Sequence, residues 1–166
     1  MTDIEGKVWA FGDDVDTDAI IPGRYLILGM SDITGHVMEG IRPGFADMVE
    51  AGDVIVAGRN FGTGSSREVA TRAILQLGVR AVIAESFARI FFRNSVNVGL
   101  APIECPGAGE IEEGQRVRID LSRGVVEVLD TGLTLEAVPL PKEIAAIVET
   151  GGLEGFLRDQ KTKGRL

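Results

Sequence analysis

The sequence predicts an α/β fold with a parallel central sheet first and a smaller antiparallel sheet after it. Two observations predict it: a glycine-bounded apolar run followed by a helical segment, and later strands of alternating pattern. Asp53–Gly58 is short and apolar, as a buried strand is. Apolar residues then recur at helical spacing from Val69 to Leu77, and Gly78 is placed to end that helix.

Beyond residue 105, alternation of polar and apolar side chains predicts half-buried strands. Gln115–Leu121 and Gly124–Leu129 both alternate in this way. The short polar break around Ser122, between the two segments, indicates a hairpin. Thr134–Leu140 is predicted to add a third strand to this group.

The C-terminal part of the chain is predicted to be helical. Pro141 opens a helix that runs through Val148. The Gly151-Gly152 pair breaks it, and Leu153–Asp159 forms a second helix. The Lys/Arg-rich tail from Lys161 is expected to be frayed.

Composition predicts one compact cytoplasmic subunit. A chain of 166 residues can bury a core, so we expect residues 1–166 to form a single domain. The formal net charge of −8 argues against nucleic acid or anionic lipid as a partner. No apolar stretch approaches the length of a membrane span, and the first residues lack a basic-then-apolar signal segment. A single cysteine, Cys105, excludes an internal disulfide and fits a reducing compartment.

Residues 61–68 read Phe-Gly-Thr-Gly-Ser-Ser-Arg-Glu, and this segment, called the octet below, is the most informative in the chain. It joins the predicted strand to the predicted helix, so two glycines, two serines and an arginine lie at a helix entrance. Backbone N–H groups at a helix N-terminus lack partners and carry roughly +0.5 of a charge, so they attract anions. Arg67 adds a guanidinium group, which can bind a carboxylate or phosphate through two hydrogen bonds. The pattern indicates an anion-handling site that contains serine oxygens.

A purely structural interpretation fits the same residues. Ser65–Glu68 match the Ser-x-x-Glu capping box, in which the two side chains satisfy each other's backbone donors. The turn lacks the third glycine of a dinucleotide fingerprint and the lysine of a phosphate-loop NTPase. Glycine spacing alone therefore leaves both interpretations open.

The octet closely resembles the active-site turn of the aconitase superfamily's swivelling domain. Further matches follow in order, and the resemblance covers most of residues 6–105. They are Phe11–Pro22, similar to the N-terminal signature of the family; Ser86–Ile90 with Arg93-Asn94, similar to its second signature helix; and Asn97–Pro102, similar to the strand that follows. In length, the chain is similar to the free-standing small subunit of 3-isopropylmalate dehydratase or homoaconitase.

The resemblance implies a three-layer β/β/α swivelling domain that takes part in a hydro-lyase. In the family, a [4Fe–4S] cluster is held by three cysteines with one iron open to substrate, acting as a Lewis acid. One cysteine cannot hold such a cluster, so Cys105 is expected to be a structural thiol. A large partner subunit, in a heterodimer or heterotetramer, would then hold the cluster. The implied substrate is a small hydroxy-di- or tricarboxylic acid whose hydroxyl moves to the neighbouring carbon by dehydration and rehydration.

The resemblance also assigns roles within the octet. The family's catalytic base is the first serine of Gly-Ser-Ser-Arg, which corresponds to Ser65. Its alkoxide would be stabilised by N–H groups around Gly64 and by the charge of Arg67, in a cleft that excludes water. Ser66 and Arg67 are expected to hold a substrate carboxylate.

Substrate choice in the family depends on residues that follow a Tyr-Leu pair, in a loop that here reads Arg24–Leu28. Homoaconitase-type subunits tend to carry arginine after the pair, whereas Ile27 and Leu28 are apolar and suit an isopropyl group. We therefore expect 3-isopropylmalate dehydratase activity, in leucine biosynthesis. The alternatives are a homoaconitase small subunit, in which Arg24 reaches an extra carboxylate, or a citraconate- or methylmalate-type hydratase.

Two interpretations from other classes stay open. The chain could be a stand-alone anion-binding module that uses the octet for phosphate. It could instead be a structural partner in which Ser65 serves only as a helix cap, so that its replacement would cost about 1 kcal/mol of stability.

The aspartates of the N-terminal signature are expected to have structural roles. Asp14, Asp16 and Asp18 have the spacing that opens a calcium loop, but the required glycine and glutamate are missing. Clustered aspartates in a turn usually cap backbone donors. We expect Asp16 and Thr17 to shape a substrate-facing loop without taking part in the chemistry.

Three further residues are also assigned structural roles. His36, the only histidine, has no recognisable partners for a Ser-His-Asp triad, so we expect a surface or packing role. Arg89 and Arg93 lie four residues apart on a predicted helix. They are expected to form ion pairs within the subunit, and the lining of an anionic-ligand pocket is the alternative.

Overall fold

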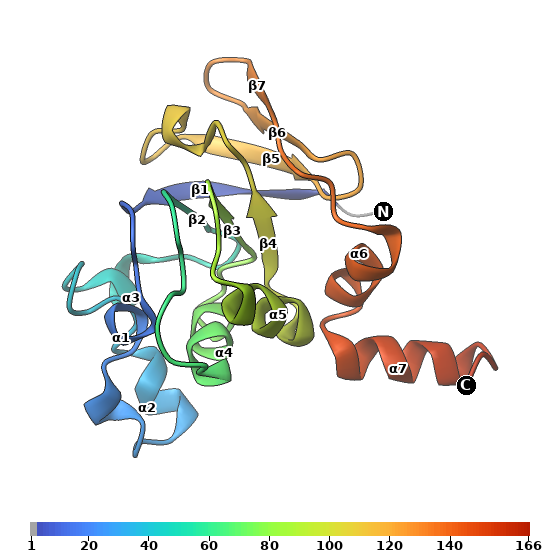
Figure 1. Cartoon of the computed structure of the whole chain (residues 1–166). Helices are drawn as coiled ribbons and strands as arrows, with labels where there is room; N and C mark the ends of the chain where they lie inside the picture. Colours follow the sequence, from blue (N-terminus) through green and yellow to red (C-terminus); the bar gives the residue numbers. More distant parts are fainter. Residues whose placement is uncertain (1–2) are drawn as a thin grey trace.

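The computed structural model describes residues 3–166 and contains one curled sheet of seven strands. The strand order is β4-β3-β2-β1-β5-β6-β7. Figure 1 shows β5, β6 and β7 on one side of β1, with β2, β3 and β4 and most helices on the other side. The arrangement is the expected α/β architecture, in which a parallel half precedes an antiparallel half.

The parallel half consists of β1 (Ile4–Ala10), β2 (Val54–Ala57), β3 (Ala81–Ala84) and β4 (Ala101–Glu104). Each of these strands runs parallel to its neighbour. All residues of β2 and β3 are buried. Strands covered on both faces read as continuous apolar runs, which is why β2 could be recognised in the sequence.

The antiparallel half consists of β5 (Arg116–Asp120), β6 (Val125–Val128) and β7 (Leu133–Glu136). These strands pair antiparallel in sequence order, and β5 also pairs antiparallel with β1. The three predicted strands and the hairpin at Ser122 are confirmed. The two expected sheets are not separate, because β1 belongs to both.

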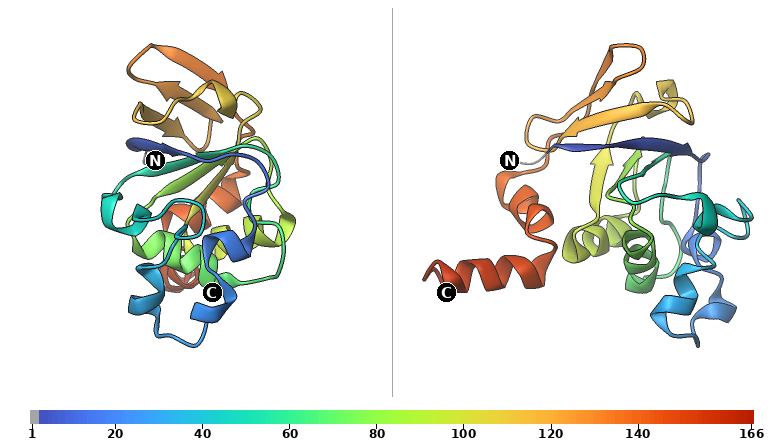
Figure 2. Two further views of the ribbon diagram at one scale, coloured as in Figure 1. Left: turned by 90° about the vertical axis from the view of Figure 1, so that its left-hand side faces the viewer. Right: turned by 180° about the vertical axis from the view of Figure 1, so that it is seen from behind.

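Helices connect the parallel strands. Between β1 and β2 the chain forms three short helices, α1 (Thr17–Ile20), α2 (Met30–Thr34) and α3 (Phe45–Met48), together with the 3-10 turn η1 (Gly23–Tyr25). Two longer helices then link β2 to β3 and β3 to β4. They are α4 (Glu68–Gln76) and α5 (Arg89–Val98). Figure 2 shows that these helices lie on one side of the parallel strands, and that β5–β7 lie on the other side of those strands.

After β4 comes the 3-10 turn η2 (Ala108–Glu110), and two helices end the chain, α6 (Lys142–Glu149) and α7 (Leu153–Thr162). Helices α6 and α7 both contact α5, and α7 extends away from the sheet and has no buried residue (Figure 1). Gly151 and Gly152 separate the two helices, both with positive φ.

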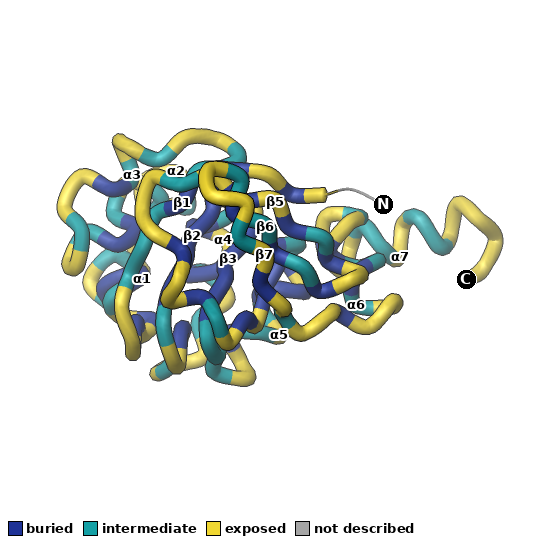
Figure 3. The backbone as a smooth tube through the Cα atoms, turned by 90° about the horizontal axis from the view of Figure 1, so that it is seen from above, coloured by how far each residue is buried: buried dark blue, intermediate teal, exposed yellow. Residues whose placement is uncertain are grey.

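Two buried clusters fill the spaces on the two faces of the parallel half. Val54 and Val56 point into a cluster shared with β5–β7 and α6. Ile55 and Ala57, their alternating neighbours, point into a cluster shared with the short helices, α4 and α5. Buried segments run through the middle of the molecule and exposed segments lie around its rim (Figure 3). The layers are therefore antiparallel strands, parallel strands and helices, as the three-layer β/β/α prediction requires.

Three boundaries differ from the sequence-based expectation. The strand expected within Thr134–Leu140 ends at Glu136. The strand expected within Asn97–Pro102 begins only at Ala101, because Asn97 and Val98 form the last turn of α5. Gly99, with φ of 89°, ends that helix in the left-handed region that favours glycine. Lys161, expected in a frayed tail, lies inside α7, where a lysine near the C-terminal end interacts favourably with the helix dipole.

No helix within residues 3–166 is long and apolar enough to cross a membrane.

Cys105 lies in the cluster between the two halves of the sheet and is fully buried. Burial raises the pKa of its thiol above the usual value, so the reactive thiolate is disfavoured. We expect a thiol reagent such as 5,5′-dithiobis(2-nitrobenzoic acid) to label the folded chain at least about tenfold more slowly than the unfolded chain. Stopped-flow absorbance with and without urea measures this ratio. Equal rates would show that the thiol is accessible.

Candidate active site

The three segments that carry the family signatures meet at the carboxyl ends of β1, β2 and β3. In parallel sheets the residues that follow neighbouring strands come together at one edge, where α/β proteins commonly bind ligands. The octet continues from β2 and lies beside the segment that follows β1. The Gly62 N–H donates to the carbonyl of Val15 at 2.7 Å, and the Thr17 N–H donates to the carbonyl of Thr63 at 2.8 Å. These bonds fix the octet to the N-terminal signature.

On its other side the octet lies beside the segment that follows β3. The Phe61 N–H donates to the carbonyl of Ser86 at 3.0 Å, and the Ala88 N–H donates back to the carbonyl of Phe61 at 3.0 Å. Just before the octet, the Asn60 N–H donates to the hydroxyl of Ser86 at 2.9 Å. The beginning of the octet is therefore held from both sides by hydrogen bonds.

Aromatic side chains of the core pack against the same turn. Phe61 is fully buried and makes an edge-to-face contact with Phe91 of α5, with ring centroids 5.1 Å apart. Gly62 has φ of 84°, and a Cβ atom there would overlap the ring of Phe91. Gly64 has φ of 98°. Both glycines are therefore required by backbone conformation, and the first also by its close approach to Phe91.

The capping-box interpretation of the octet is wrong. The N-cap residue of α4 is Arg67, and no side chain caps this helix. The hydroxyl of Ser65 instead lies 3.3 Å from the hydroxyl of Thr17, and the carboxylate of Glu68 accepts from Arg72. The helix begins later than the sequence indicated, because the serines belong to the turn that is tied to β1.

The turn leaves backbone donors free. The N–H groups of Gly64, Ser65 and Ser66 have no acceptor within residues 3–166. The N–H of Arg67 is not among them, since it donates to the carbonyl of Ser65 at 3.0 Å. Free N–H groups on consecutive residues make a concave anion-binding surface of the kind found in phosphate and oxyanion sites.

Arg67 is held in place by the loop after α1. Its guanidinium donates to the carbonyl of Ile21 at 2.9 Å and lies 3.5 Å from a carboxylate oxygen of Asp18. Asp18 also accepts from the N–H of Gly23 at 2.9 Å, which ties this carboxylate to the loop. The Arg67 side chain is 23% exposed, so the guanidinium is oriented by the loop and still reaches the surface.

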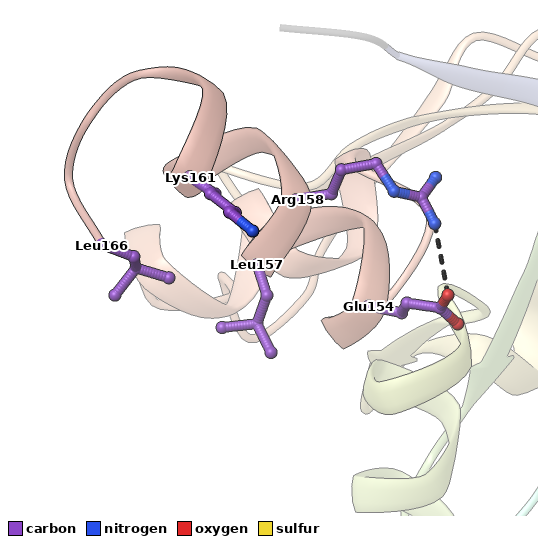
Figure 4. A pocket seen from close by; sticks show the side chains of 5 residues that line it. All are labelled: Glu154, Leu157, Arg158, Lys161 and Leu166. Carbon is purple, nitrogen blue, oxygen red and sulfur yellow. Dashed lines mark hydrogen bonds and ion pairs between the residues drawn. The ribbon is translucent and has the colours of Figure 1, made fainter.

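The catalytic candidates lie on an open surface. Gly64, Ser65 and Ser66 are all exposed. Five hollows on the surface of residues 3–166 are lined entirely by residues outside the octet. One of them lies along α7, where Leu157 and Leu166 lie to one side of the Glu154–Arg158 ion pair (Figure 4). Within residues 3–166, Ser65 therefore lies on an exposed surface.

The expected substrate loop lies next to Arg67, because an added Cβ at Gly23 would be 3.6 Å from the Arg67 guanidinium. Arg24 lies over the Tyr25 ring, with 4.6 Å between guanidinium carbon and ring centroid, and donates to its hydroxyl. No hydrogen bond or ion pair among residues 3–166 joins Arg24 to the octet. Ile27 is 91% exposed, whereas Leu28 packs partly against the helix-side cluster.

The aspartates of the N-terminal signature form local contacts, as expected. Asp13 accepts from the N–H and guanidinium of Arg59, which lowers the pKa of Asp13. Asp14 accepts from the side-chain amide of Asn60, and Asp16 caps α1 by accepting from the N–H of Ala19. These contacts satisfy donors in the turns rather than forming a calcium loop.

His36 and the two arginines of α5 have different outcomes. His36 stacks on Tyr25 at 3.8 Å and lies 3.0 Å from Glu39, which confirms a packing role. Arg89 and Arg93 line a hollow with two phenylalanines, and neither forms an ion pair within residues 3–166. The expectation of ion pairs within the subunit is therefore wrong.

The sequence indicated that Thr17 shapes the loop, but it did not indicate that the Thr17 hydroxyl contacts Ser65. A threonine in an aspartate-rich turn reads as a loop residue, and only the pairing of Asp16 with Thr63 brings its hydroxyl to Ser65. The signal available in the sequence was its position after a strand that neighbours the octet strand, but strand order cannot be read from the residues themselves.

The described residues do not fit an iron–sulfur cluster. Within residues 3–166 no group of three or more His, Cys, Asp or Glu side chains is placed to hold a metal ion. Cys105 is buried in the core, far along the chain from the octet.

Comparison with known proteins agrees with the geometry. Residues 45–108 match the Aconitase C-terminal domain family. The 3-isopropylmalate dehydratase small subunit of Methanosarcina acetivorans is 49% identical over 93% of this chain and 96% of its own length. The small subunit 1 of Methanopyrus kandleri is 52% identical over 93% and 92%. A methanogen homoaconitase small subunit from Methanothermobacter thermautotrophicus is 51% identical over 90% and 88%.

A solved structure is also similar over nearly the whole chain. The crystal structure of 3-isopropylmalate dehydratase from Methanocaldococcus jannaschii superposes with a TM-score of 0.91, at 45% identity, covering 98% of each chain. The three layers and the octet at the carboxyl edge thus define a swivelling domain of the aconitase class. The chain belongs to the family of 3-isopropylmalate dehydratase small subunits.

The conformation of the octet generates a stability prediction. We expect Gly62→Ala to lower the free energy of unfolding by more than about 1 kcal/mol, because alanine disfavours this positive φ and its methyl group would overlap Phe91. The matched control is Gly40→Ala, where no heavy atom lies within 4 Å of the added Cβ. Urea titration followed by circular dichroism measures both. An equal, small effect in the two variants would contradict the assignment of strain to Gly62.

Proposed function

We propose that this chain is the small subunit of a 3-isopropylmalate dehydratase, which interconverts 2- and 3-isopropylmalate in leucine biosynthesis. The observation that carries the proposal is the octet itself. Ser65 lies in a rigid turn, beside free backbone N–H groups and an oriented arginine, at the carboxyl edge of the parallel strands. Family membership supplies the reaction class, a stereospecific dehydration followed by rehydration.

Ser65 acts as the base in this proposal. Elimination of water requires removal of the proton from the carbon next to a carboxylate, and Ser65 takes that proton on its side-chain oxygen. An ordinary serine alkoxide is far too basic to exist at neutral pH, so it must be stabilised. The free N–H groups of Gly64–Ser66 and the Arg67 charge are the stabilising groups that the turn provides. One such donor is worth about 100–1,000-fold in rate.

Ser66 and Arg67 bind a substrate carboxylate. The Ser66 side chain and N–H face solvent next to Ser65, and the guanidinium of Arg67 is oriented by the loop after α1. A carboxylate held between them would place the adjacent carbon near Ser65. Positioning of this kind makes the proton transfer effectively intramolecular.

The exposure of Ser65 implies a partner. In open water an alkoxide would be protonated at once and the N–H groups would be solvated, so stabilisation by the turn would be weak. A large subunit must cover the octet to exclude water. The same partner would hold the [4Fe–4S] cluster, which supplies a Lewis acid for the substrate hydroxyl.

Substrate choice is assigned to the loop after η1. Ile27 presents an exposed apolar side chain, and Arg24 is engaged with the Tyr25 ring. An extra substrate carboxylate placed against Ile27 would lack a partner, at a cost of several kcal/mol. An isopropyl group has no such cost. Because one relative of similar identity is named a homoaconitase small subunit, overall identity does not separate the two activities and the loop must do so.

Ser65→Ala tests the base. We expect the enzyme reconstituted with its large subunit to lose at least about 99% of kcat, because no other side chain in the turn replaces the proton acceptor. Folding and subunit association are expected to be unchanged, as circular dichroism and analytical ultracentrifugation can check. Ser31→Ala, an exposed serine in α2, is the matched control and should be fully active. Retention of more than a few per cent of kcat by Ser65→Ala would refute the base.

Ile27→Arg tests the specificity loop. We expect the wild-type enzyme to prefer isopropylmalate over homoaconitate, and the variant to shift the ratio of kcat/KM values toward homoaconitate by about tenfold or more, because the new guanidinium pairs with the extra carboxylate. Steady-state kinetics with both substrates measures the ratio, and Ile27→Leu serves as the control. A wild-type preference for homoaconitate would overturn the assignment to isopropylmalate.

A further inference from the structure

Thr17 presents a buried hydroxyl to the proposed base. It is only 3% exposed, in contrast to Ser65, and its Oγ1 lies 3.3 Å from Ser65 Oγ. Ser65 therefore has two sides. Its outer side is open, where a substrate can approach, and its inner side faces the threonine.

Among the described residues, the hydroxyls of Thr17 and Ser65 are each other's sole side-chain partner. Within residues 3–166 the Thr17 hydroxyl makes no other hydrogen bond, and neither does the hydroxyl of Ser65. A buried hydroxyl without a partner is costly, so the Thr17 side chain gains from this contact. In the resting state either oxygen can donate.

The backbone places Thr17 independently of its hydroxyl. Its N–H donates to the carbonyl of Thr63 at 2.8 Å, and Asp16 before it pairs with Thr63 and caps α1. Gly64 permits the approach, because a Cβ atom at that position would lie 3.2 Å from Thr17 Oγ1. The octet glycine and the N-terminal threonine thus fit together as a pair.

We propose that the Thr17 hydroxyl donates a hydrogen bond to Ser65 Oγ and so positions and stabilises the deprotonated base. The inference rests on the proposed function of Ser65. An alkoxide has no proton to give, so Thr17 must be the donor when Ser65 is the base. At 3.3 Å the contact is long for a bond between hydroxyls, and a charged acceptor shortens such bonds to about 2.5–2.7 Å. Thr17 is a positioning residue, since it acts through Ser65 and does not touch substrate.

This donor complements the other stabilising groups around Ser65. The N–H groups of the turn belong to exposed residues, and the Arg67 side chain is 23% exposed. Thr17 is the donor on the inner side, and burial keeps water from competing for its proton. The hydrogen bond from Thr17 also orients the serine oxygen. Because the bond comes from the buried side, the lone pairs on the exposed side stay free to take a proton.

The test compares Thr17→Val with Thr17→Ser in the assembled enzyme. Valine matches threonine in shape but cannot donate, so we expect kcat to fall about 10–100-fold, the usual value of a hydrogen bond to a charged group. KM should stay within about threefold, because the bond acts in the transition state and not in substrate binding. Thr17→Ser restores the hydroxyl and should recover most of kcat.

A second readout separates proton transfer from a general structural effect. With isopropylmalate carrying deuterium at the carbon that loses its proton, we expect the isotope effect on kcat to be larger in Thr17→Val than in wild type. The reason is that a weaker base makes proton removal more rate-limiting. A loss of activity caused by misfolding would leave this ratio unchanged. If Thr17→Val does not associate with the large subunit, Thr17→Ala provides the same comparison without a second methyl group.

The outcomes distinguish this inference from the proposed function. Full kcat in Thr17→Val, or equal losses in Thr17→Val and Thr17→Ser, would overturn the role of the hydroxyl while an inactive Ser65→Ala still supported the base. Activity retained by Ser65→Ala would instead overturn the proposed function itself. Loss of kcat in Thr17→Val with recovery in Thr17→Ser and a raised isotope effect would support the inference.

Discussion

The site depends on one constraint, the attachment of a glycine-containing turn to the segments on both of its sides. Hydrogen bonds from Gly62 to Val15 and from Phe61 to Ser86 hold the turn as an extension of the parallel sheet. Because the backbone is fixed there, Ser65, its free N–H neighbours and Arg67 keep their relative positions without a regular helix cap. The sheet order makes this possible, since β2 lies between β1 and β3. A turn at a sheet edge strand could be held from one side only.

The fold was largely predictable from local patterns. Each kind of burial gives its own sequence pattern. A strand buried on both faces, such as β2, is a continuous apolar run, and a half-buried strand, such as β5 or β6, alternates. A helix buried on one face, such as α4, has apolar residues at helical spacing. The sharing of β1 by both halves was not predictable. The residues of Ile4–Ala10 do not indicate that this strand pairs parallel with β2 on one edge and antiparallel with β5 on the other. Long-range packing sets the partners of a strand.

The sequence singled out the residues of the octet but not the geometry of their turn. The octet identified Ser65 and Arg67 through family resemblance, yet Ser65–Glu68 also read as a capping box, which the structure does not contain. The local sequence favours a helix cap at Ser65, but the pairing of Thr63 with Asp16 holds this segment as a turn instead. The contact between Thr17 and Ser65 was missed for the same reason, because the two residues lie 48 positions apart in sequence. Arg89 and Arg93 show the limit of default assumptions about charged pairs. Glu104 lines the same hollow, yet neither arginine forms an ion pair within residues 3–166.

The openness of the turn has a consequence for the cell. In the proposed enzyme, Ser65 gains its reactivity only where solvent is displaced, and the isolated polypeptide displaces none. A surplus copy would offer passing metabolites an ordinary alcohol and nothing more. Unequal synthesis of the two subunits would therefore waste protein without setting loose an uncontrolled elimination, and the meeting of the two chains would itself switch the chemistry on.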